Sequence, residues 1–519
     1  MSGLKQPTVG IDLGTRNALC ACVEDGNAMV IPNRWGRLVT PSVVGWDEGW
    51  KVGEDAVRLS LRGAEEVWWD LKRRVGTSFS AVVEGTPHRA EELLVPLLTA
   101  LREDAEAYLG TFVSSCVLAV PACFSLLQRE LMARAARAAG MEARVVAEPT
   151  AATLAFGREG RFLVFDFGAG TVDISVVESE GGVWQVLESV GSPETGGYDF
   201  DLALAACLKE RLLLSELEES DPRWRTLVAE AERVKIALSG VASYEWTPPP
   251  LGPRPSNPLM VEREEMERLM RFFIRRLAHV VRRLWERYEP DHLLLVGGSS
   301  RIPLLKEILE REVALPERLS LCAEEAIAVG AALYASGGQE RLLLDALSGD
   351  IEALWGDEVE KIVASGSPLP FEAWKEFEAK EVGRVSLRLQ QTSGELRGEP
   401  SPLSAVELEL RAGERVTLFC RLDASGRLSA ELRREDGARS SLPLSAGAAG
   451  ESDKKEDPAV VNERRLRELK LALVPLEVCL DEEQRGRLYR LIRQAEGVCF
   501  DARSVEIVEG LVKDLESLV

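Results

Sequence analysis

The stretch LVFDFGAGTVDISVV, residues Leu163–Val177, decides the fold predicted for this chain. Its apolar start predicts a buried strand ending near Asp166, a turn follows at Gly168–Thr171, and Val172–Val177 predicts a return strand. Glycines let backbone N–H groups approach a phosphate closely, and threonine adds a hydroxyl donor. Because a carboxylate cannot hold an anion, Asp166 is expected to hold a metal ion or the waters around it. A single turn of this kind is equally typical of an ordinary hairpin.

A second copy of the pattern lies near the N-terminus, in Val9–Val23, VGIDLGTRNALCACV. It combines an apolar strand, Asp12, a Gly14-Thr15 turn and an apolar return strand. Two such hairpins, far apart in the chain, predict a duplicated domain whose turns face one nucleotide. A third glycine site, Leu293–Pro303 (LLLVGGSSRIP), places Gly-Gly after a strand, a form suited to lying against a nucleoside at a helix start.

Composition limits the classes of protein that the chain can represent. A length of 519 residues predicts three or more domains. The net charge of −22 repels nucleic acid and anionic membrane surfaces, so neither is an expected partner. The nine cysteines contain no CxxC pair, and Cys20 and Cys22 are expected to be buried reduced thiols on one face of a strand. The chain has no apolar signal core and no apolar run of about 18 residues, so we expect a cytoplasmic protein.

The three glycine-bearing segments together resemble the superfamily of sugar kinases, actins and 70-kDa heat-shock (DnaK-type) chaperones. Thr40–Trp46 (TPSVVGW) and Ala147–Ala152 (AEPTAA) resemble segments of the chaperones in particular. The segment Leu342-Leu343-Leu344-Asp345 resembles the chaperones' interdomain linker, which actins and sugar kinases lack. The resemblance implies an α/β fold: a duplicated actin-like (ribonuclease H-like) ATPase domain, then a small β-sandwich and a short α-helical bundle.

The domain organisation follows from the resemblance and from changes in pattern along the chain. Val385–Gln390 and Val416–Leu422 alternate apolar and polar residues, which predicts strands, whereas Leu466, Leu469 and Leu473 have helical spacing. The expected segments are an ATPase domain at 1–338, an interdomain linker at 339–349, a β-sandwich similar to a substrate-binding domain at 350–445, a flexible linker at 446–457 and a short helical lid-like domain at 458–519.

The resemblance also implies the residues of an ATPase site. Trp68–Gly76 (WWDLKRRVG) resembles the family segment whose lysine positions the attacking water, and Lys72 falls at that place. Lys72, Glu148 and Asp173 are expected to orient the water and neutralise charge, with Thr171 as a fourth catalytic residue. Asp12 and Asp166 are expected to hold Mg²⁺ through its waters, because this ion dehydrates reluctantly.

The expected ligands of ATP or ADP come from all the glycine-bearing segments and from one helix. Glu232, Lys235 and Ser239 share one helix face, which is typical of a solvated stripe but resembles the family's adenosine-binding helix. The complete expected set is Gly14, Thr15, Arg16, Gly168, Ala169, Gly170, Thr171, Gly196, Gly197, Glu232, Lys235, Ser239, Gly297, Gly298, Ser299 and Arg301. K⁺ is a further candidate cofactor.

Coupling residues and partners are implied by the same resemblance. Pro121 and Arg129, with Glu148, are expected to relay nucleotide state to the linker residues Leu342, Leu343, Leu344 and Asp345. The expected partners are unfolded polypeptide or a dedicated protein partner, and a J-domain co-chaperone. The small lobes look shorter than the family's, notably at Gly76–Pro87 and Thr247–Pro258, so dependence on a nucleotide-exchange factor is doubtful.

Three departures from the family pattern affect these expectations. Arg16 replaces a threonine, and it is expected either to point into solvent or to reach the γ-phosphate. Ala169 replaces a glycine and disfavours positive φ, so the turn must tolerate it. Leu354–Glu358 replaces the glycine- and methionine-bearing loop of the peptide groove, which predicts a groove that is altered or lost. We therefore expect ATP binding to survive while hydrolysis is slower or differently controlled.

Three functions remain in competition. The leading prediction is an ATP-dependent molecular chaperone of the 70-kDa heat-shock type, which binds unfolded polypeptide in protein folding and the stress response. The alternative is a nucleotide-switched scaffold that binds a dedicated partner and hydrolyses ATP weakly. An actin-like filament or a sugar kinase is disfavoured by the linker and by the β-rich C-terminal part.

Overall fold

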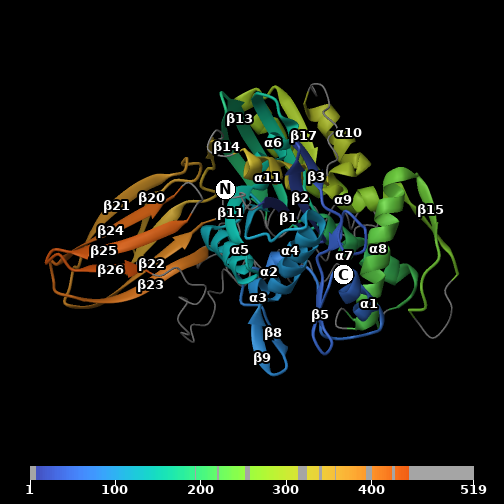
Figure 1. Cartoon of the computed structure of the whole chain (residues 1–519), viewed down its shortest axis with the longest axis horizontal. Coiled ribbons are helices and arrows are strands. Elements are labelled where there is room, and N and C mark those ends of the chain that lie inside the picture. Colours follow the sequence, from blue (N-terminus) through green and yellow to red (C-terminus); the bar gives the residue numbers. More distant parts are fainter. Residues whose placement is uncertain are drawn as a thin grey trace, which may run out of the picture. The chain divides into compact units, whose positions relative to one another are not determined.

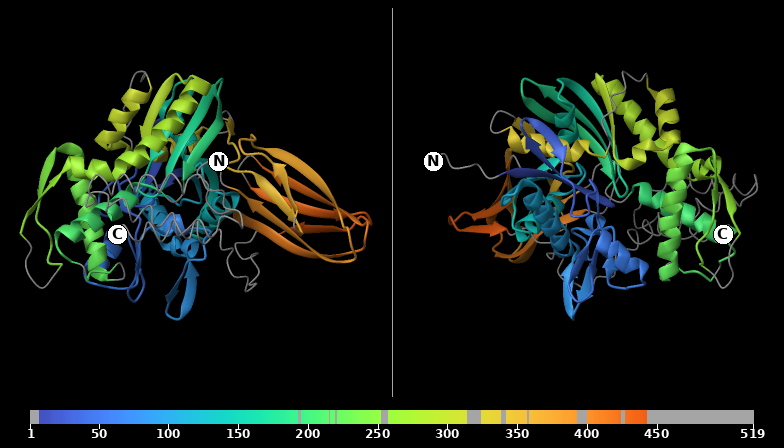
Figure 2. Two further views of the ribbon diagram at one scale, coloured as in Figure 1. Left: turned by 180° about the vertical axis from the view of Figure 1, so that it is seen from behind. Right: turned by 45° about the vertical axis from the view of Figure 1, so that its right-hand side comes forward.

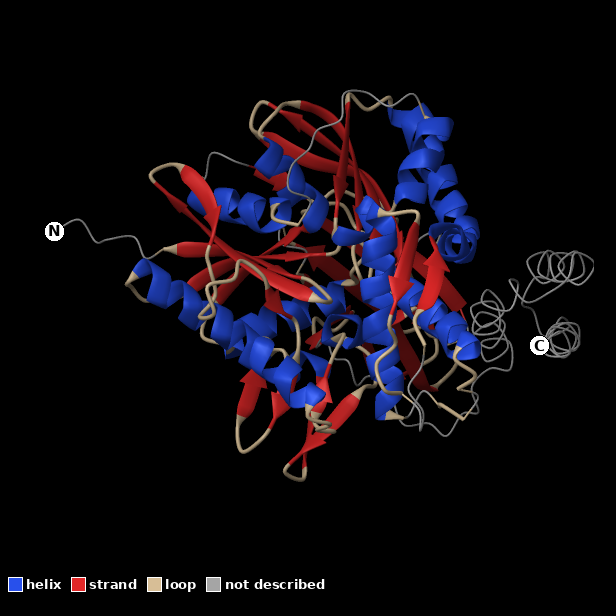
Figure 3. Cartoon of the chain, turned by 90° about the vertical axis from the view of Figure 1, so that its right-hand side faces the viewer, coloured by secondary structure: helices blue, strands red, loops and turns tan. Residues whose placement is uncertain are grey.

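The structure is a computed structural model that describes residues 7–192, 195–214, 216–218, 221–251, 257–313, 324–337, 342–356, 358–392, 400–423 and 427–442. Helices and strands alternate up to Ser336, and the described residues after it form strands only, which confirms the predicted α/β class for the first part of the chain (Figure 3). The predicted linker at 446–457 and the predicted helical domain at 458–519 lie outside the described residues. No helix in the described part of the chain is long and apolar enough to cross a membrane.

The described residues divide into two compact units. Apart from the gaps given above, the first contains residues 7–197, 278–300 and 309–442, and the second contains residues 198–277 and 301–308. The first unit includes the helices α1 (Glu54–Leu61), α2 (Leu71–Arg74), α3 (Ala90–Leu93), α4 (Val95–Leu109), α5 (Leu126–Ala138), α6 (Glu148–Phe156) and α11 (Ala326–Ser336).

The first sheet of the first unit contains the N-terminal hairpin. Its strand order is β11 (Glu142–Ala147), β10 (Ser115–Val120), β1 (Thr8–Leu13), β2 (Asn17–Glu24) and β3 (Asn27–Val30), with β4 (Thr40–Pro41) paired to β2. Strand β1 pairs antiparallel with β2 and parallel with β10. Five of the six residues of β1 are buried, as expected for a strand covered on both faces.

The second sheet repeats this plan around the stretch Leu163–Val177. Its order is β17 (His292–Val296), β12 (Gly160–Phe167), β13 (Val172–Glu180), β14 (Val183–Ser192) and β18 (Leu342–Leu344). Strand β12 pairs antiparallel with β13 and parallel with β17, just as β1 pairs with β2 and β10. The shared pairing pattern agrees with the duplication predicted from the two Asp-bearing hairpins.

Helices α6 and α11 pack tightly in the core of the first unit. Helix α11 is rich in alanine and is buried on several sides. A Cβ at Gly10 of β1 would collide with backbone atoms of Ala328 and Ala332, so the strand and the helix are in contact because Gly10 has no side chain. Helix α5 begins at its predicted cap, where the Ser125 side chain accepts from the Gln128 amide, and Gly140 follows its end with positive φ.

Smaller sheets flank these elements in the first unit. One contains β6 (Trp50–Val52), β5 (Val44–Trp46) and β7 (Val67–Trp68), and the other is the hairpin of β8 (Ser80–Val83) and β9 (Thr86–Arg89). Strand β7 leads directly into α2, the short helix that carries Lys72.

The C-terminal part of the first unit consists of two four-stranded sheets, drawn in orange in Figures 1 and 2. One contains β20 (Glu358–Val363), β19 (Ile351–Trp355), β22 (Gly383–Gln391) and β23 (Ser401–Leu410), and the other contains β21 (Phe371–Glu378), β24 (Arg415–Leu422), β25 (Leu428–Arg434) and β26 (Arg439–Leu442). All strand pairs in both sheets are antiparallel. Their alternate residues, such as Leu387, Leu389, Leu418 and Leu432, belong to one buried cluster.

The second unit is mainly helical. It contains most of α7 (Gly197–Arg211), α8 (Pro222–Gly240), the hairpin of β15 (Ser243–Trp246) and β16 (Leu259–Glu262), the first part of α9 (Arg263–Tyr288) and the first part of α10 (Pro303–Glu312). Asp221 caps α8 by accepting from the Arg223 amide. Phe200 and Phe273 pack edge to face, with ring centroids 5.7 Å apart.

Candidate active site

The two Asp-bearing turns meet in the first unit. Asp12 and Asp166 are each the last residue but one of their strands, β1 and β12, and both side chains are buried. Thr15, in the first turn, lies so close to Gly170 of the second that a Cβ at Gly170 would collide with it. Gly170 is therefore required for the contact between the turns, which the sequence pattern predicted to face each other.

Ala169 is accommodated because the second turn does not need a left-handed backbone. The non-glycine residues with positive φ in the described chain do not include Ala169. Gly168 and Gly170 also lie outside the set of glycines with positive φ. The glycine requirement in this turn is thus one of space, at Gly170, and the methyl group of Ala169 is tolerated.

Several predicted nucleotide ligands surround the second turn. The Gly168 carbonyl accepts from the Gly197 amide at 3.0 Å and from the Ser299 hydroxyl at 3.0 Å. Gly196 lies against the Ala169 carbonyl, and Gly297 lies against Phe167 and Asp166. The structure brings these four residues together around the turn, and that they bind nucleotide stays a prediction. Two of their donors, the Gly197 amide and the Ser299 hydroxyl, bind the turn itself and thereby fix its shape.

Lys72 lies among the carboxylates of this site. Its Nζ donates to Glu148 Oε1 at 2.7 Å, and its side chain is only 4% exposed. Burial would lower the pKa of Lys72, but the carboxylates of Glu148, Asp12 and Asp166 outweigh burial and raise it above its ordinary value. Lys72 is therefore a fixed cation beside both Asp-bearing turns.

The carboxylates carry more negative charge than Lys72 can balance. Burial and then the charge of Glu148 raise the pKa of Asp12 to about 7 and that of Asp173 to about 8, with Lys72 opposing both shifts. The pKa of Asp166 is raised well above its usual value by burial, Glu148, Asp173 and Asp12. A site of this charge favours a bound cation.

The donor set fits a magnesium ion held largely through water. Asp166 Oδ2 is buried and has no hydrogen-bond partner, so one carboxylate oxygen is available to a cation or to its waters. Within the described residues no group of three or more acidic, histidine or cysteine side chains is placed for direct coordination of a metal. Water and phosphate oxygens would therefore complete the coordination shell, which is the usual arrangement for Mg²⁺.

Asp173 has a partner that the sequence did not reveal. Cys123 donates to it twice, from its amide at 2.9 Å and from its thiol at 3.4 Å. Burial and the nearby Asp173 raise the pKa of the Cys123 thiol well above its ordinary value. The only sequence signal was that Cys123 stands two residues after Pro121, a predicted coupling residue. Pro121 is buried.

The raised pKa of Cys123 predicts slow alkylation. At pH 8 the thiol is protonated in the folded protein, and the thiolate is the reactive form. We expect iodoacetamide to label Cys123 at least about tenfold more slowly in the folded chain than in the chain unfolded in urea. Mass spectrometry of the peptide that contains Cys123 measures both rates, and equal rates would show that Asp173 does not hold the thiol.

Arg16 lies against the residues that precede α2. Its Nη1 lies 3.7 Å from Asp70 Oδ1, and its guanidinium carbon lies 5.5 Å from the centre of the Trp69 ring. Arg16 and Asp70 side chains are 14% and 11% exposed, so the arginine does not extend into solvent. Contact with a γ-phosphate stays a prediction.

The predicted adenosine ligands on α8 belong to the second unit. Lys235 forms a buried ion pair with Asp201 at 2.6 Å, and the Ser239 hydroxyl donates to the Lys235 carbonyl. The face is therefore not a simple solvated stripe. Arg301 ends the short 3₁₀ helix Gly298–Arg301 and is exposed. That these residues and Glu232 bind adenosine stays a prediction.

The predicted linker is a strand at the edge of the second sheet. Leu342–Leu344 forms β18, which pairs parallel with β14. Asp345 follows directly and binds two residues, Arg129 at 3.0 Å and the Thr150 hydroxyl at 3.3 Å. Of the predicted coupling residues, Arg129 and Asp345 are thus joined by a buried ion pair, and Leu343 is buried two residues before Asp345.

The C-terminal sheets contact α5 next to this network. Gln391 at the end of β22 accepts from the Leu126 amide at 2.8 Å, and the Ser348 hydroxyl donates to the Phe124 carbonyl at 3.1 Å. The Leu126 amide is one of the donors that a helix start leaves unpaired. Sequence reasoning missed both contacts, since neither residue belongs to a recognisable motif.

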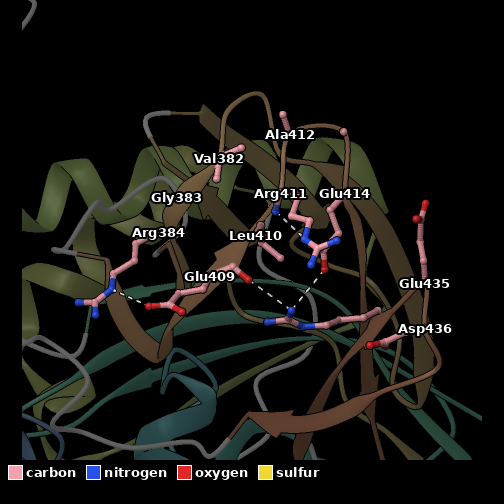
Figure 4. A pocket seen from close by; sticks show the side chains of 12 residues that line it. Val382, Gly383, Arg384, Glu409, Leu410, Arg411, Ala412, Glu414, Glu435 and Asp436 are labelled. Carbon is pink, nitrogen blue, oxygen red and sulfur yellow. Dashed lines mark hydrogen bonds and ion pairs between the residues drawn. The ribbon is translucent and has the colours of Figure 1, made fainter.

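A separate hollow lies at one end of the C-terminal sheets (Figure 4). It has a volume of about 870 Å³ and is lined by turns between strands, including Val382–Arg384, Glu409–Glu414 and Arg434–Asp436. Its charged side chains pair with one another, as in Arg384 with Glu409 and Arg434 with Glu414. It contains none of the predicted nucleotide ligands.

Comparison with known families gives one match. The family model described as "Hsp70 protein" matches residues 8–411. The match spans both Asp-bearing turns, the Lys72 segment, the strand β18 and most of the C-terminal sheets.

Proposed function

Because the chain belongs to the Hsp70 family, whose members are ATPases and chaperones, we propose that it binds and hydrolyses ATP to control the binding of polypeptide. The observation that carries this proposal is the contact between the two Asp-bearing turns, through Thr15 and Gly170. Each turn carries a buried threonine, Thr15 in the first and Thr171 in the second, and Lys72 is buried as well. Phosphoryl transfer needs little more from a protein than such positioning and charge.

Asp12 and Asp166 would hold Mg²⁺, largely through its waters. The bound ion would neutralise charge on the phosphates and relieve the repulsion among the buried carboxylates. Asp166 Oδ2, buried without a hydrogen-bond partner, supports this assignment.

The other residues of the site would bind and orient. Thr15 and Thr171, with the backbone of Gly168–Gly170, would cradle the β- and γ-phosphates. Lys72, fixed by Glu148 at 2.7 Å, would neutralise charge that develops on the transferring phosphoryl group. Asp173 and Glu148 would orient the attacking water, and Cys123 holds Asp173 in place through two hydrogen bonds.

Nucleotide state would reach the C-terminal sheets through contacts that begin at Asp173. Cys123 bonds Asp173, and the residues that follow it, Phe124 and Leu126, bond Ser348 and Gln391. Arg129 and Thr150 hold Asp345 immediately after β18. A shift of the Cys123 segment on hydrolysis would therefore disturb both the linker and the sheets.

A second candidate, a scaffold for a dedicated partner, is favoured by the hairpin of β19 and β20. Trp355 pairs directly with Glu358, so only two residues connect the strands. The Trp355 ring stacks on Phe377 with centroids 5.1 Å apart, and both rings are buried. A short turn and a filled interior leave little room for the open loop of a general peptide groove.

Calorimetric titration with ATP and ADP, with and without Mg²⁺, tests the proposal. We expect binding of both nucleotides that is strengthened by Mg²⁺, followed by measurable turnover. Absence of nucleotide binding would refute the proposal. Turnover that responds to an unfolded polypeptide supports the chaperone, whereas turnover or binding without such a response favours the scaffold. A J-domain protein is the natural further addition to the turnover assay.

A further inference from the structure

Arg16 joins the first Asp-bearing turn to the segment that carries Lys72. Its carbonyl accepts from the Ser42 amide at 2.8 Å, which fixes its backbone. Its guanidinium lies between the Asp70 carboxylate and the Trp69 ring, both in the segment between β7 and α2. Trp69 in turn packs against the small buried cluster of Val43, Ala56 and Val67. The side chain is thus held from two sides by the segment that leads to Lys72.

Asp70 has a left-handed backbone at the start of the helix that carries Lys72. It is the N-cap of α2, two residues before Lys72, and its backbone is left-handed with φ 55° and ψ 26°. A residue other than glycine keeps such a conformation only where its surroundings enforce it. The ion pair with Arg16 is a contact that does so, because it fixes the side chain of the strained residue.

From this geometry we infer that Arg16 is a positioning residue for Lys72, acting through Asp70 and Trp69, and does not act as a phosphate ligand. The inference rests on the proposed ATPase function. A guanidinium that swung to a γ-phosphate would give up its contacts with the mostly buried Asp70 carboxylate and with the Trp69 ring. Arg16 instead links the first Asp-bearing turn to the start of α2, the helix that carries Lys72.

The test compares two substitutions that break the same contact. Arg16→Met removes the charge and keeps a long side chain, and Asp70→Asn removes the opposite charge with the same shape. We expect each to slow single-turnover ATP hydrolysis by about 10- to 100-fold, because small misplacements of a catalytic group have effects of this size. The affinity for ATP and ADP should change by less than about threefold, since no phosphate ligand is lost. The double variant should be no slower than the slower single variant.

Two controls separate positioning from general stability. Arg16→Lys keeps the positive charge and should recover part of the rate. Arg34→Met breaks another ion pair of the same unit, Arg34 with Asp104 at 2.8 Å, which does not touch either turn. It should lower the thermal midpoint without slowing the single turnover.

Three other outcomes would contradict the inference or the proposed function. If Arg16→Met weakens ATP binding at least tenfold and leaves ADP binding unchanged, Arg16 is a γ-phosphate ligand and the inference is wrong. If Arg16→Met and Arg34→Met both destabilise the fold but hydrolyse at the wild-type rate, the Arg16 contact is only structural. If the wild-type chain neither binds nor hydrolyses ATP, the proposed function itself fails, and the inference fails with it.

Discussion

Replacement of Lys72 by methionine is expected to slow ATP hydrolysis by about 10²- to 10³-fold, the usual effect of removing one preorganised electrostatic contact. The Lys72 ammonium is buried and its pKa is raised by Glu148, Asp12 and Asp166, so it stays charged throughout the pH range of the assay. In the proposed mechanism this charge would offset the negative charge that develops in the transition state. Single-turnover hydrolysis, measured together with the dissociation constant for ATP, checks the expectation.

The affinity for Mg²⁺ and ATP should fall far less than the rate, because the turns at Thr15 and Gly168–Thr171 remain. Loss of Lys72 removes a positive charge and so increases the electrostatic repulsion among the buried carboxylates. The thermal midpoint of the variant should therefore fall without ligand and recover when Mg²⁺ and ATP are added. Arg34→Met is the control for general stability, because it breaks an ion pair of the same unit that does not touch either turn. Hydrolysis by Lys72→Met at the wild-type rate would remove Lys72 from the mechanism, and a complete loss of ATP binding would make it a binding residue.

The parts of the site that were predictable from the sequence are those in which local pattern and chemistry coincide. An apolar strand followed by Asp, Gly and Thr indicates both the strand end and its chemistry, and its repetition predicted the pairing of the turns at Thr15 and Gly170. Ser125 and Gly140 were equally predictable, because helix caps depend on a few adjacent residues. Such features need no knowledge of the rest of the chain.

The parts that were missed depend on contacts between residues distant in sequence. Cys123 bonds Asp173, and Gln391 bonds the start of α5, but neither contact leaves a periodic trace. The sequence alone could not show where the Arg16 side chain lies, because the residues that it contacts, Trp69 and Asp70, belong to another segment of the chain. Ala169 was expected to strain the turn because the sequence comparison suggested a positive φ there. In the structure its φ is not positive, and the residue that must be glycine is Gly170, where a Cβ would collide with Thr15.

The strand β18 gives the second large prediction, because its neighbouring residues have different environments. Leu343 is 8% exposed and belongs to a buried cluster with Val177 and Val186, whereas Leu342 is 50% exposed on the same strand. Leu343→Asp would place an unpaired carboxylate in that cluster, which strongly disfavours the pairing of β18 with β14. We expect the linker to leave the sheet in this variant, so that polypeptide no longer stimulates ATP hydrolysis while basal hydrolysis continues.

Leu342→Asp is the matched control, since it adds the same charge one residue away, on the exposed side of the strand. Hydrogen exchange of the β18 amides measures docking directly, and ATP turnover with and without an unfolded polypeptide measures coupling. Exchange should become faster by at least about tenfold in Leu343→Asp and stay near the wild-type rate in Leu342→Asp. If Leu343→Asp exchanges at the wild-type rate, burial of Leu343 does not hold β18 in the sheet, and the expectation is wrong. Rapid exchange with an unchanged response would instead leave the contacts of Gln391 and Ser348 with α5 as the coupling route, because they do not depend on β18.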